Sequence, residues 1–354
     1  MSLLEHRPTY KPFRYPWAYA YWEKQQKVHW LPDEVPLGDD VKDWKSKLND
    51  SERNLLTQIF RFFTQSDVEV NNCYMKHYAQ VFQPTEVQMM MSAFSNMETI
   101  HIAAYSHLLD TIGMPEAEYE AFLKYGAMKD KYDYMQQFGT ETKEGIAMTL
   151  AVFSGFTEGL QLFASFAILL NFPRHNKMKG MGQIVTWSVR DETLHCEGML
   201  RVFNTFIAEN KEIWTEKLQN DIKEACQTVV GMEDAFIDLA FEMGDMEGLS
   251  AAEVKQYIRY IADRRLGQMN LEPIFNIEKN PLPWLDVMLN ATEHANFFEQ
   301  RATEYTRAAT QGSWDDAFAI HQQSKMLERL SAQHGGQING TADSERNSTT
   351  GSTS

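Results

Sequence analysis

The sequence predicts an all-α protein, a bundle of long core helices, and three observations carry that prediction. No stretch of the 354 residues alternates apolar and polar side chains as a half-buried strand would. Only three of the eleven prolines lie between Pro36 and Pro273, so long helices can run without interruption. Apolar residues recur at helical spacing between these prolines.

The two ends of the chain differ in composition from its central part. Residues 1–45 contain five prolines and many aromatic residues, which predicts an N-terminal arm of extended chain and short helices packed on the bundle. We expect the bundle itself to occupy residues 46–310. Residues 311–354 are expected to form a flexible tail, because the chain from residue 332 onward is rich in Gly, Ser, Thr, Asn and Gln.

The first long helix is predicted from Ser51 to Phe82 and would be about 48 Å long at 1.5 Å per residue. Its central acids, Asp67 and Glu69, are two residues apart and so point in different directions. Asp67 follows Phe63 by four residues and falls on the apolar stripe, whereas Glu69 does not. We therefore expect Asp67 to face the interior.

The most apolar segment is AMTLAVFSGFTEGLQLFASFAILLNF, residues 147–172, in which Glu158 is the only charged residue. The segment is long enough to span a membrane, which takes about 20 apolar residues. Its central acid, its scattered Ser, Thr and Gln and the lack of a second comparable span favour a buried core helix. An ionised carboxylate there needs a partner or a metal ion, and the alternative is a protonated, hydrogen-bonded Glu158.

Two Glu-x-x-His steps lie in separate helical stretches, Glu98 to His101 and Glu192 to His195. A three-residue step places both side chains on one face of a helix, so each pair offers a carboxylate and an imidazole to one point. Roughly one such pair would arise by chance in a chain of this composition, so the motif alone is weak.

Context strengthens the motif, because each Glu-x-x-His pair can be matched with a lone acid on another apolar helix. Four carboxylates and two imidazoles without a thiolate suit iron or manganese better than structural zinc. This ligand pattern is typical of ferritin-like bundles that hold two metal ions. The expected fold is therefore a ferritin-like bundle enclosing a di-metal site. The predicted ligands are Asp67, Glu98, His101, Glu158, Glu192 and His195.

Charge and cysteine content restrict the partners and the compartment. The net charge of −16 argues against general nucleic-acid binding, which requires clustered Lys and Arg. The three cysteines, Cys73, Cys196 and Cys226, are unclustered, and no apolar signal segment opens the chain. We expect a cytoplasmic protein without a membrane span.

Several segments resemble the small (beta) subunit of class I ribonucleotide reductase. METIHIAAYSHLL (97–109) is similar to the second-helix signature of that family, and WSVRDETLHCEG (187–198) is similar to its fourth-helix signature. The resemblance extends to HWLPDEVPL (29–37), FTQSDVEVNNCYMKHY (63–78) and FTEGLQ (156–161). It therefore covers most of the chain.

The resemblance implies which residues hold each metal ion and which residue is oxidised. Asp67, Glu98 and His101 would hold one ion, and Glu158, Glu192 and His195 the other. The ions would be two irons, two manganese ions or one of each, since the ligands suit both metals. Tyr105, four residues after His101, would form a stable tyrosyl radical. Without the resemblance, Tyr105 reads as an ordinary buried tyrosine.

The family also implies a route from the metal site to the surface through Trp30 and Asp191. Asp191 is expected to accept a hydrogen bond from the second ring nitrogen of His101 and to bind the indole N–H of Trp30. The alternatives are an ion pair between Asp191 and Arg190, and simple packing of Trp30 on the bundle. Phe163 and Phe166 are candidates for an apolar wall around the radical, or for plain core.

The implied partner is the large (alpha) subunit, which carries the nucleotide site, and the implied assembly is a homodimer. Tyr305 is the candidate relay residue of the C-terminal segment, and WDDAF (314–318) is similar to the family's acidic and aromatic docking end. Residues 319–354 extend beyond the point where that peptide would ordinarily stop, which puts docking by a chain terminus in doubt.

Two other classes of function share the same ligand set. One is a stand-alone di-metal oxidase or oxygenase that acts on its own ligand, and the other is a ferritin-like ferroxidase that stores metal. Tyr105, Trp30, Asp191 and the WDDAF segment favour the radical-generating subunit, because neither alternative needs an exit route for an electron.

Overall fold

The computed structural model describes residues 2–118 and 120–289, and it confirms the all-α, ferritin-like prediction. The described residues contain helices and one isolated β-bridge, between Met246 and Leu249, but no strand. The α-helices are α1 (Pro16–Lys27), α2 (Gly38–Lys42), α3 (Asp50–Cys73), α4 (Ala79–Val81), α5 (Thr85–Ile112), α6 (Gly126–Met135), α7 (Lys143–Thr149), α8 (Leu162–Arg174), α9 (Lys179–Glu209), α10 (Glu216–Ala240) and α11 (Ala251–Gln268).

Shorter helical segments connect or interrupt these helices. Three are π-helical: η2 (Asp43–Lys47), η3 (Tyr74–Tyr78) and η6 (Leu150–Gln161). Four are 3₁₀ turns: η1 (Pro32–Glu34), η4 (Glu116–Glu118), η5 (Ala121–Lys124) and η7 (Lys211–Ile213). Wide turns of the π-helical kind change the direction in which side chains point, and they are frequent at functional sites.

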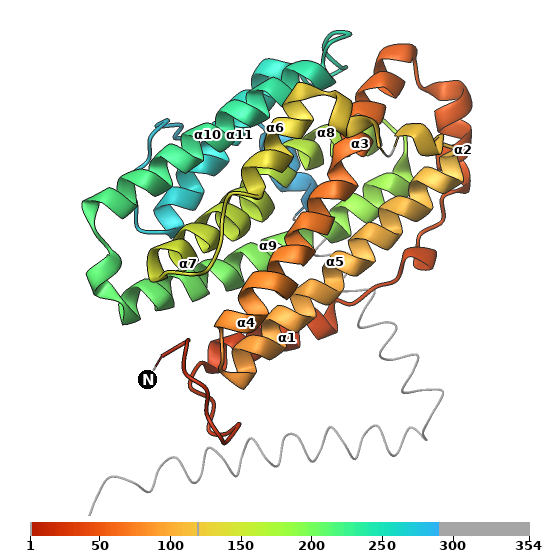
Figure 1. Ribbon diagram of the computed structural model, residues 1–354. Coiled ribbons are helices and arrows are strands. Elements are labelled where there is room, and N and C mark those ends of the chain that lie inside the picture. The colour runs from red at the N-terminus through yellow and green to blue at the C-terminus, as the bar shows by residue number, and fades with distance from the viewer. Residues whose placement is uncertain (1, 119, 290–354) are drawn as a thin grey trace, which may run out of the picture. The chain divides into compact units, whose positions relative to one another are not determined.

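Four long helical runs form the central bundle: α3, α5, the run α7–η6–α8, and α9. Helix α3 packs on α5, α5 on α9, and α9 on η6 and α8, as Figure 1 shows. Helices α10 and α11 pack on each other and cover η6. Helix α9, with 31 residues, is about 46 Å long at 1.5 Å per residue.

The predicted helix from Ser51 to Phe82 is present but not uniform. It begins at Asp50, where the side chain of Asn49 accepts a hydrogen bond from the backbone N–H of Glu52 and completes a capping box. After Cys73 it continues as the π-helical segment η3 and then as α4. The sequence therefore predicted the extent of this run and missed the π-helical turn.

The apolar segment 147–172 is a core helix. It lies within the run Lys143–Arg174, the one helix among the described residues that is long and apolar enough to cross a membrane, and its apolar window is wholly buried by the rest of the protein. Its central part is the π-helix η6, in which all twelve residues are buried. Pro173 lies in the last turn of α8, which ends at Arg174.

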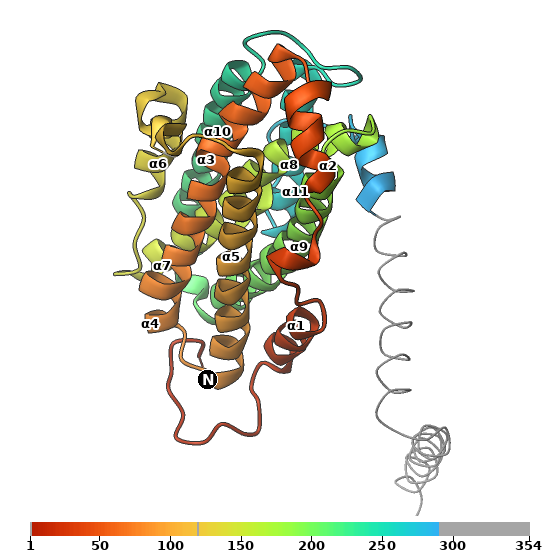
Figure 2. The same ribbon diagram turned by 90° about the vertical axis from the view of Figure 1, so that its right-hand side faces the viewer.

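The N-terminal arm belongs to the same compact unit as the bundle, which spans Met1–Leu289. Helix α1 packs on α5 and α9, and Figure 2 shows it beside them. Asp40 of α2 accepts hydrogen bonds from the backbone N–H groups of Gly180 and Met181, so the arm also caps the first turn of α9. The predicted boundary at residue 310, the tail 311–354, Tyr305 and the WDDAF segment lie outside the described residues.

A buried ion pair joins two helices away from the bundle centre. Lys131 of α6 is paired with Glu233 of α10, and both side chains are buried. The Lys131 ammonium lies between two rings, 4.5 Å from the centroid of Phe62 and 4.4 Å from that of Phe236. Burial raises the pKa of Glu233 and lowers that of Lys131, because removal from water disfavours the charged form of each group.

Replacing Lys131 by Met is expected to lower the free energy of unfolding by about 3–5 kcal/mol at neutral pH, because Glu233 is left buried without its counter-charge. In the folded protein the pKa of Glu233 is above its unfolded value. The loss of stability from the buried charge is therefore complete when the pH is above the folded pKa, and it becomes smaller as the pH falls toward 4.5, the ordinary value. Urea unfolding at several pH values measures the free energy of unfolding and its change with pH. The double variant Lys131→Met, Glu233→Met should recover most of the loss, and a single variant as stable as wild type would contradict the argument.

Candidate metal centre

The six predicted ligands come from the four central helical runs, and all are buried. Asp67 lies on α3, Glu98 and His101 on α5, Glu158 on η6, and Glu192 and His195 on α9. None has more than 1% of its surface exposed. The neighbouring acid Glu69 accepts hydrogen bonds from Gln65 and Gln136. Asp67 faces the interior as expected, and its assignment as a metal ligand stays a prediction.

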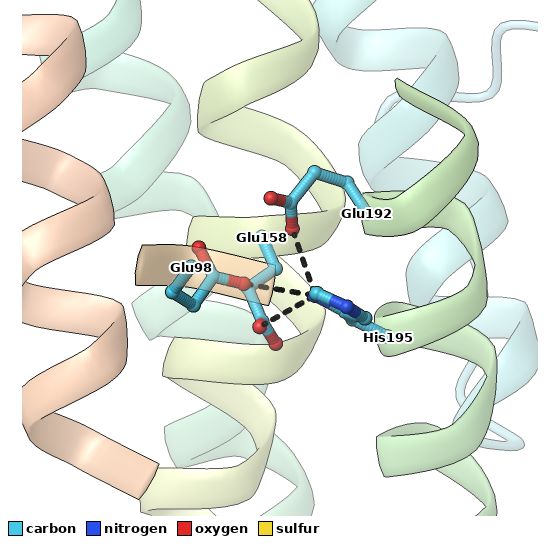
Figure 3. Close-up of side chains that lie close together, drawn as sticks. All are labelled: Glu98, Glu158, Glu192 and His195. Carbon is cyan, nitrogen blue, oxygen red and sulfur yellow. Dashed lines mark ion pairs between the residues drawn. The ribbon is translucent and has the colours of Figure 1, made fainter. Parts of the chain in front are cut away.

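Four of the six ligands form one tight group. One ligand atom from each of Glu98, Glu158, Glu192 and His195 lies within 4.8 Å of the others. Figure 3 shows the three carboxylates around the His195 ring. His195 Nδ1 is 2.9 Å from Glu98 Oε1, 3.6 Å from Glu192 Oε2 and 3.8 Å from Glu158 Oε1.

The second imidazole extends the group in the other direction. His101 Nδ1 is 3.1 Å from Glu192 Oε1 and 3.6 Å from Glu98 Oε2. Glu98 and Glu192 thus each direct one oxygen toward each imidazole, and the two ring centroids are 6.2 Å apart. Both carboxylates could therefore help to hold a pair of cations. Burial raises the pKa of Asp67, and Glu98 is the charged neighbour that raises it most.

The buried oxygens of this group fit a cation, because most of them have no hydrogen-bond donor. The unpaired buried atoms are Asp67 Oδ2, both oxygens of Glu98, Glu158 Oε2, both oxygens of Glu192 and His195 Nδ1. Buried polar atoms left without a partner are rare in folded proteins, and each needs an explanation. Two divalent ions would satisfy the whole set, and the mixed oxygen and imidazole donors suit iron or manganese.

Burial and the closeness of their charges shift the pKa values of the predicted ligands. Burial, followed by repulsion from neighbouring carboxylates, raises the pKa of Asp67 and of Glu158 well above the ordinary values. Burial alone would lower the pKa of His195, but its contacts with Glu192 and Glu98 raise it to about 10. Protons on these groups would have to leave before metal ions could bind.

Asp191 orients one imidazole and connects it to the arm. His101 Nε2 is 3.3 Å from Asp191 Oδ2, and Trp30 Nε1 donates to the same oxygen at 2.8 Å. With Nε2–H directed at Asp191, the Nδ1 lone pair of His101 faces the carboxylates. The alternative contact is present as well, since Arg190 lies 3.2 Å from Asp191 Oδ1.

Gln25 orients the other imidazole and was missed by the sequence analysis. Its Oε1 is 3.2 Å from His195 Nε2, and its Nε2 donates to Asp191 Oδ1 at 3.2 Å. Gln25 therefore joins His195 to Asp191, and the two imidazoles share one supporting network. No local signal distinguishes Gln25 from Gln26, because only the docking of α1 decides which of them is buried.

Tyr105 lies in a closed apolar environment beside the carboxylates. It is 1% exposed, and its hydroxyl donates to Ser188 Oγ at 3.0 Å, which in turn donates to the carbonyl of Ile184. Burial, followed by the charge of Asp67, raises the pKa of the phenol. The ring in edge contact with Tyr105 is Phe63, with centroids 4.7 Å apart. Phe166 packs behind Phe63 at 5.4 Å, and Phe163 packs on Phe166.

Replacing Asp191 by Ala is expected to weaken metal binding by about 10- to 100-fold, because His101 loses the acceptor that fixes its tautomer and Gln25 loses its anchor. A competition titration of the metal-free protein with a chromophoric chelator and Mn²⁺ measures the affinity. The control is Asp238→Ala on α10, whose exposed carboxylate pairs only with Lys255 among the contacts described. Unchanged affinity in the Asp191 variant would contradict the assigned support.

This chain is similar to known proteins over most of its length. Residues 7–281 match the family model "Ribonucleotide reductase, small chain". The chain is 49% identical over 354 aligned positions to the "Probable ribonucleoside-diphosphate reductase small subunit" of Invertebrate iridescent virus 6, covering 89% of this chain and 98% of that one. It is 30% identical to the ribonucleoside-diphosphate reductase subunit beta of Chlamydia pneumoniae, covering 84% and 89% of the two chains.

A solved structure has the same fold. The ribonucleotide reductase R2 subunit from Clostridium botulinum superposes with a TM-score of 0.76 at 21% identity, over 82% of this chain and 94% of that one. The match to the family model covers most of the chain, and the first of these relatives is nearly half identical to it. This chain therefore belongs to the ribonucleotide reductase small-chain family, whose named members are subunits of an oxidoreductase.

Proposed function

We propose that this chain is the radical-generating small subunit of a class I ribonucleoside-diphosphate reductase and that its oxidisable residue is Tyr105. The observation that carries the proposal is a buried group of carboxylates and imidazoles with unpaired oxygens, one member of which, His101, lies one helical turn from the buried phenol of Tyr105. A pair of iron or manganese ions held by these residues would be oxidised by dioxygen or a reduced oxygen species and would then accept one electron from this phenol, which loses its proton at the same time.

The residues around Tyr105 manage the proton and exclude water. The phenol donates its hydrogen bond to Ser188 Oγ, which gives the phenolic proton a defined direction when the electron leaves. Phe63 and the rings behind it close the other side of the phenol. A dry surrounding of this kind protects a radical from reduction by solvent-borne species.

The route proposed for the oxidising equivalent to leave runs through His101, Asp191 and Trp30, and an electron would travel along it in the opposite direction, toward Tyr105. The indole of Trp30 stacks near His101, with centroids 6.0 Å apart, and both donate to the same carboxylate oxygen. A stand-alone oxidase or a ferroxidase has no use for this chain of contacts.

The proposed partner that receives the oxidising equivalent is the large subunit, with Tyr305 as relay and residues 314–318 as docking segment. Homodimer assembly and a cytoplasmic location are further parts of the proposal.

The experiment that separates these functions uses wild type and Trp30→Phe. Both proteins are loaded anaerobically with iron, exposed to air, examined by electron paramagnetic resonance and then mixed with a large subunit. Both should show the organic radical, because Tyr105 and the ligands are intact, but only wild type should form deoxyribonucleotides. A chain truncated before Tyr305 should behave like Trp30→Phe. Wild type without a radical would leave the oxidase and storage functions ahead.

A further inference from the structure

A second buried tyrosine, Tyr74, contacts the candidate metal centre through Glu158. Its hydroxyl donates to Glu158 Oε1 at 2.8 Å, and 1% of its surface is exposed. Both residues lie on π-helical segments, Tyr74 on η3 and Glu158 on η6. The proposed radical chemistry assigns no role to Tyr74.

The ring of Tyr74 is held so that its hydroxyl has one direction. It packs edge-on against Tyr78 at 5.5 Å, Phe94 at 6.4 Å and His195 at 6.5 Å between centroids. Phe94 lies 4.5 Å from the His195 ring, so the aromatic cluster also fixes that imidazole. A buried phenol needs an acceptor, and Glu158 is the acceptor that the structure describes.

The hydrogen bond restricts the carboxylate of Glu158. With Oε1 held by the phenol 3.8 Å from His195 Nδ1, the carboxylate cannot rotate freely, and Oε2 stays buried without a partner. Glycine at position 159 lets Arg265 approach the same turn, where its Nε donates to the Gly159 carbonyl at 2.7 Å. The side chain of Glu158 and the carbonyl of the next residue, Gly159, are thus held by two different partners.

We propose that Tyr74 is a positioning residue for the metal position formed by Glu158 and His195: its phenol fixes the orientation in which Glu158 meets the ion. This inference rests on the metal centre proposed above. The neighbouring Tyr78 provides a matched control, because its hydroxyl lies 3.2 Å from the Thr149 carbonyl and 3.1 Å from Ser154 Oγ, away from the ligands.

The test titrates metal-free wild type, Tyr74→Phe and Tyr78→Phe with Co²⁺, following the visible absorption of the ion, and repeats the affinities with Mn²⁺. Tyr74→Phe should bind one equivalent as wild type does and the other about 10- to 100-fold more weakly, with altered cobalt bands, as expected when an outer partner of a ligand is lost. Tyr78→Phe should match wild type. The inference would be overturned if Tyr74→Phe bound both metal ions with wild-type affinity, or if Tyr78→Phe weakened metal binding as much as Tyr74→Phe does.

A second comparison guards against a folding defect. In the Glu158→Ala background the phenol has no acceptor, so adding Tyr74→Phe should not lower the thermal midpoint and should leave the remaining cobalt affinity unchanged. An equal loss of stability from Tyr74→Phe in both backgrounds would mean that the tyrosine is only structural. Failure of the wild type to bind two ions would refute the proposed metal centre instead, which keeps the two failures distinct.

Discussion

Replacing Tyr105 by Phe is expected to abolish the organic radical signal and to reduce deoxyribonucleotide formation with the large subunit to the background of the assay. The ring and its packing on Phe63 remain, but phenylalanine has no hydroxyl that can lose an electron together with a proton. Metal content should stay at the wild-type level, because the Tyr105 hydroxyl bonds to Ser188 and not to a ligand. The lost hydrogen bond should change stability by only about 1 kcal/mol.

The measurement is electron paramagnetic resonance after anaerobic metal loading and exposure to air, with metal analysis of the same sample. Tyr134→Phe is the matched control, since Tyr134 is a half-buried tyrosine on α6, away from the ligands. That control should keep the signal and the activity. A radical of wild-type shape and intensity in Tyr105→Phe would refute Tyr105 as the oxidised residue.

Replacing Glu158 by Ala is expected to remove one or both metal ions while leaving the helical fold in place. Glu158 is the only charged residue of the apolar segment 147–172, and its buried Oε2 has no hydrogen-bond partner among the described residues. The metal-free protein should tolerate the change, because it removes a carboxyl whose pKa is already raised by burial and by the charge of Glu192. The Tyr74 hydroxyl left without an acceptor should cost about 1–3 kcal/mol.

Metal content per chain after loading and desalting, together with circular dichroism, measures both parts of this expectation. Wild type should retain two ions per chain and the variant one or none, with equal helical signals. The control is Glu197→Ala, an exposed acid of α9 two residues from His195. Full metal occupancy in Glu158→Ala would exclude Glu158 as a ligand.

Helical periodicity predicted much of this site from the sequence. The three-residue step of each Glu-x-x-His pair requires both side chains to share a face, and the apolar stripe of α3 was enough to choose Asp67 over Glu69. These are local properties of a regular helix. The isolation of Glu158 in an apolar segment was equally informative, because burying a lone carboxylate is too unfavourable to be accidental.

The remaining features depend on irregular turns and on contacts between distant segments. A π-helical turn adds a residue to the turn, so the face on which Tyr74 and Glu158 lie cannot be read from a period of 3.6. Tyr74 follows Asp67 by seven residues, a spacing that could have drawn attention to it. Gln25 gave no such signal, since its role exists only after α1 has packed on α9.

The placement of Gln25 and Trp30 has a consequence for the order in which the protein is assembled. Both lie on the arm that precedes the bundle in the chain, yet the groups they support lie on helices that are synthesised later, the last of them at His195. Full alignment of the two imidazoles must therefore wait until α9 has been synthesised and the arm has docked on it. Tight metal uptake would then mark the completion of folding.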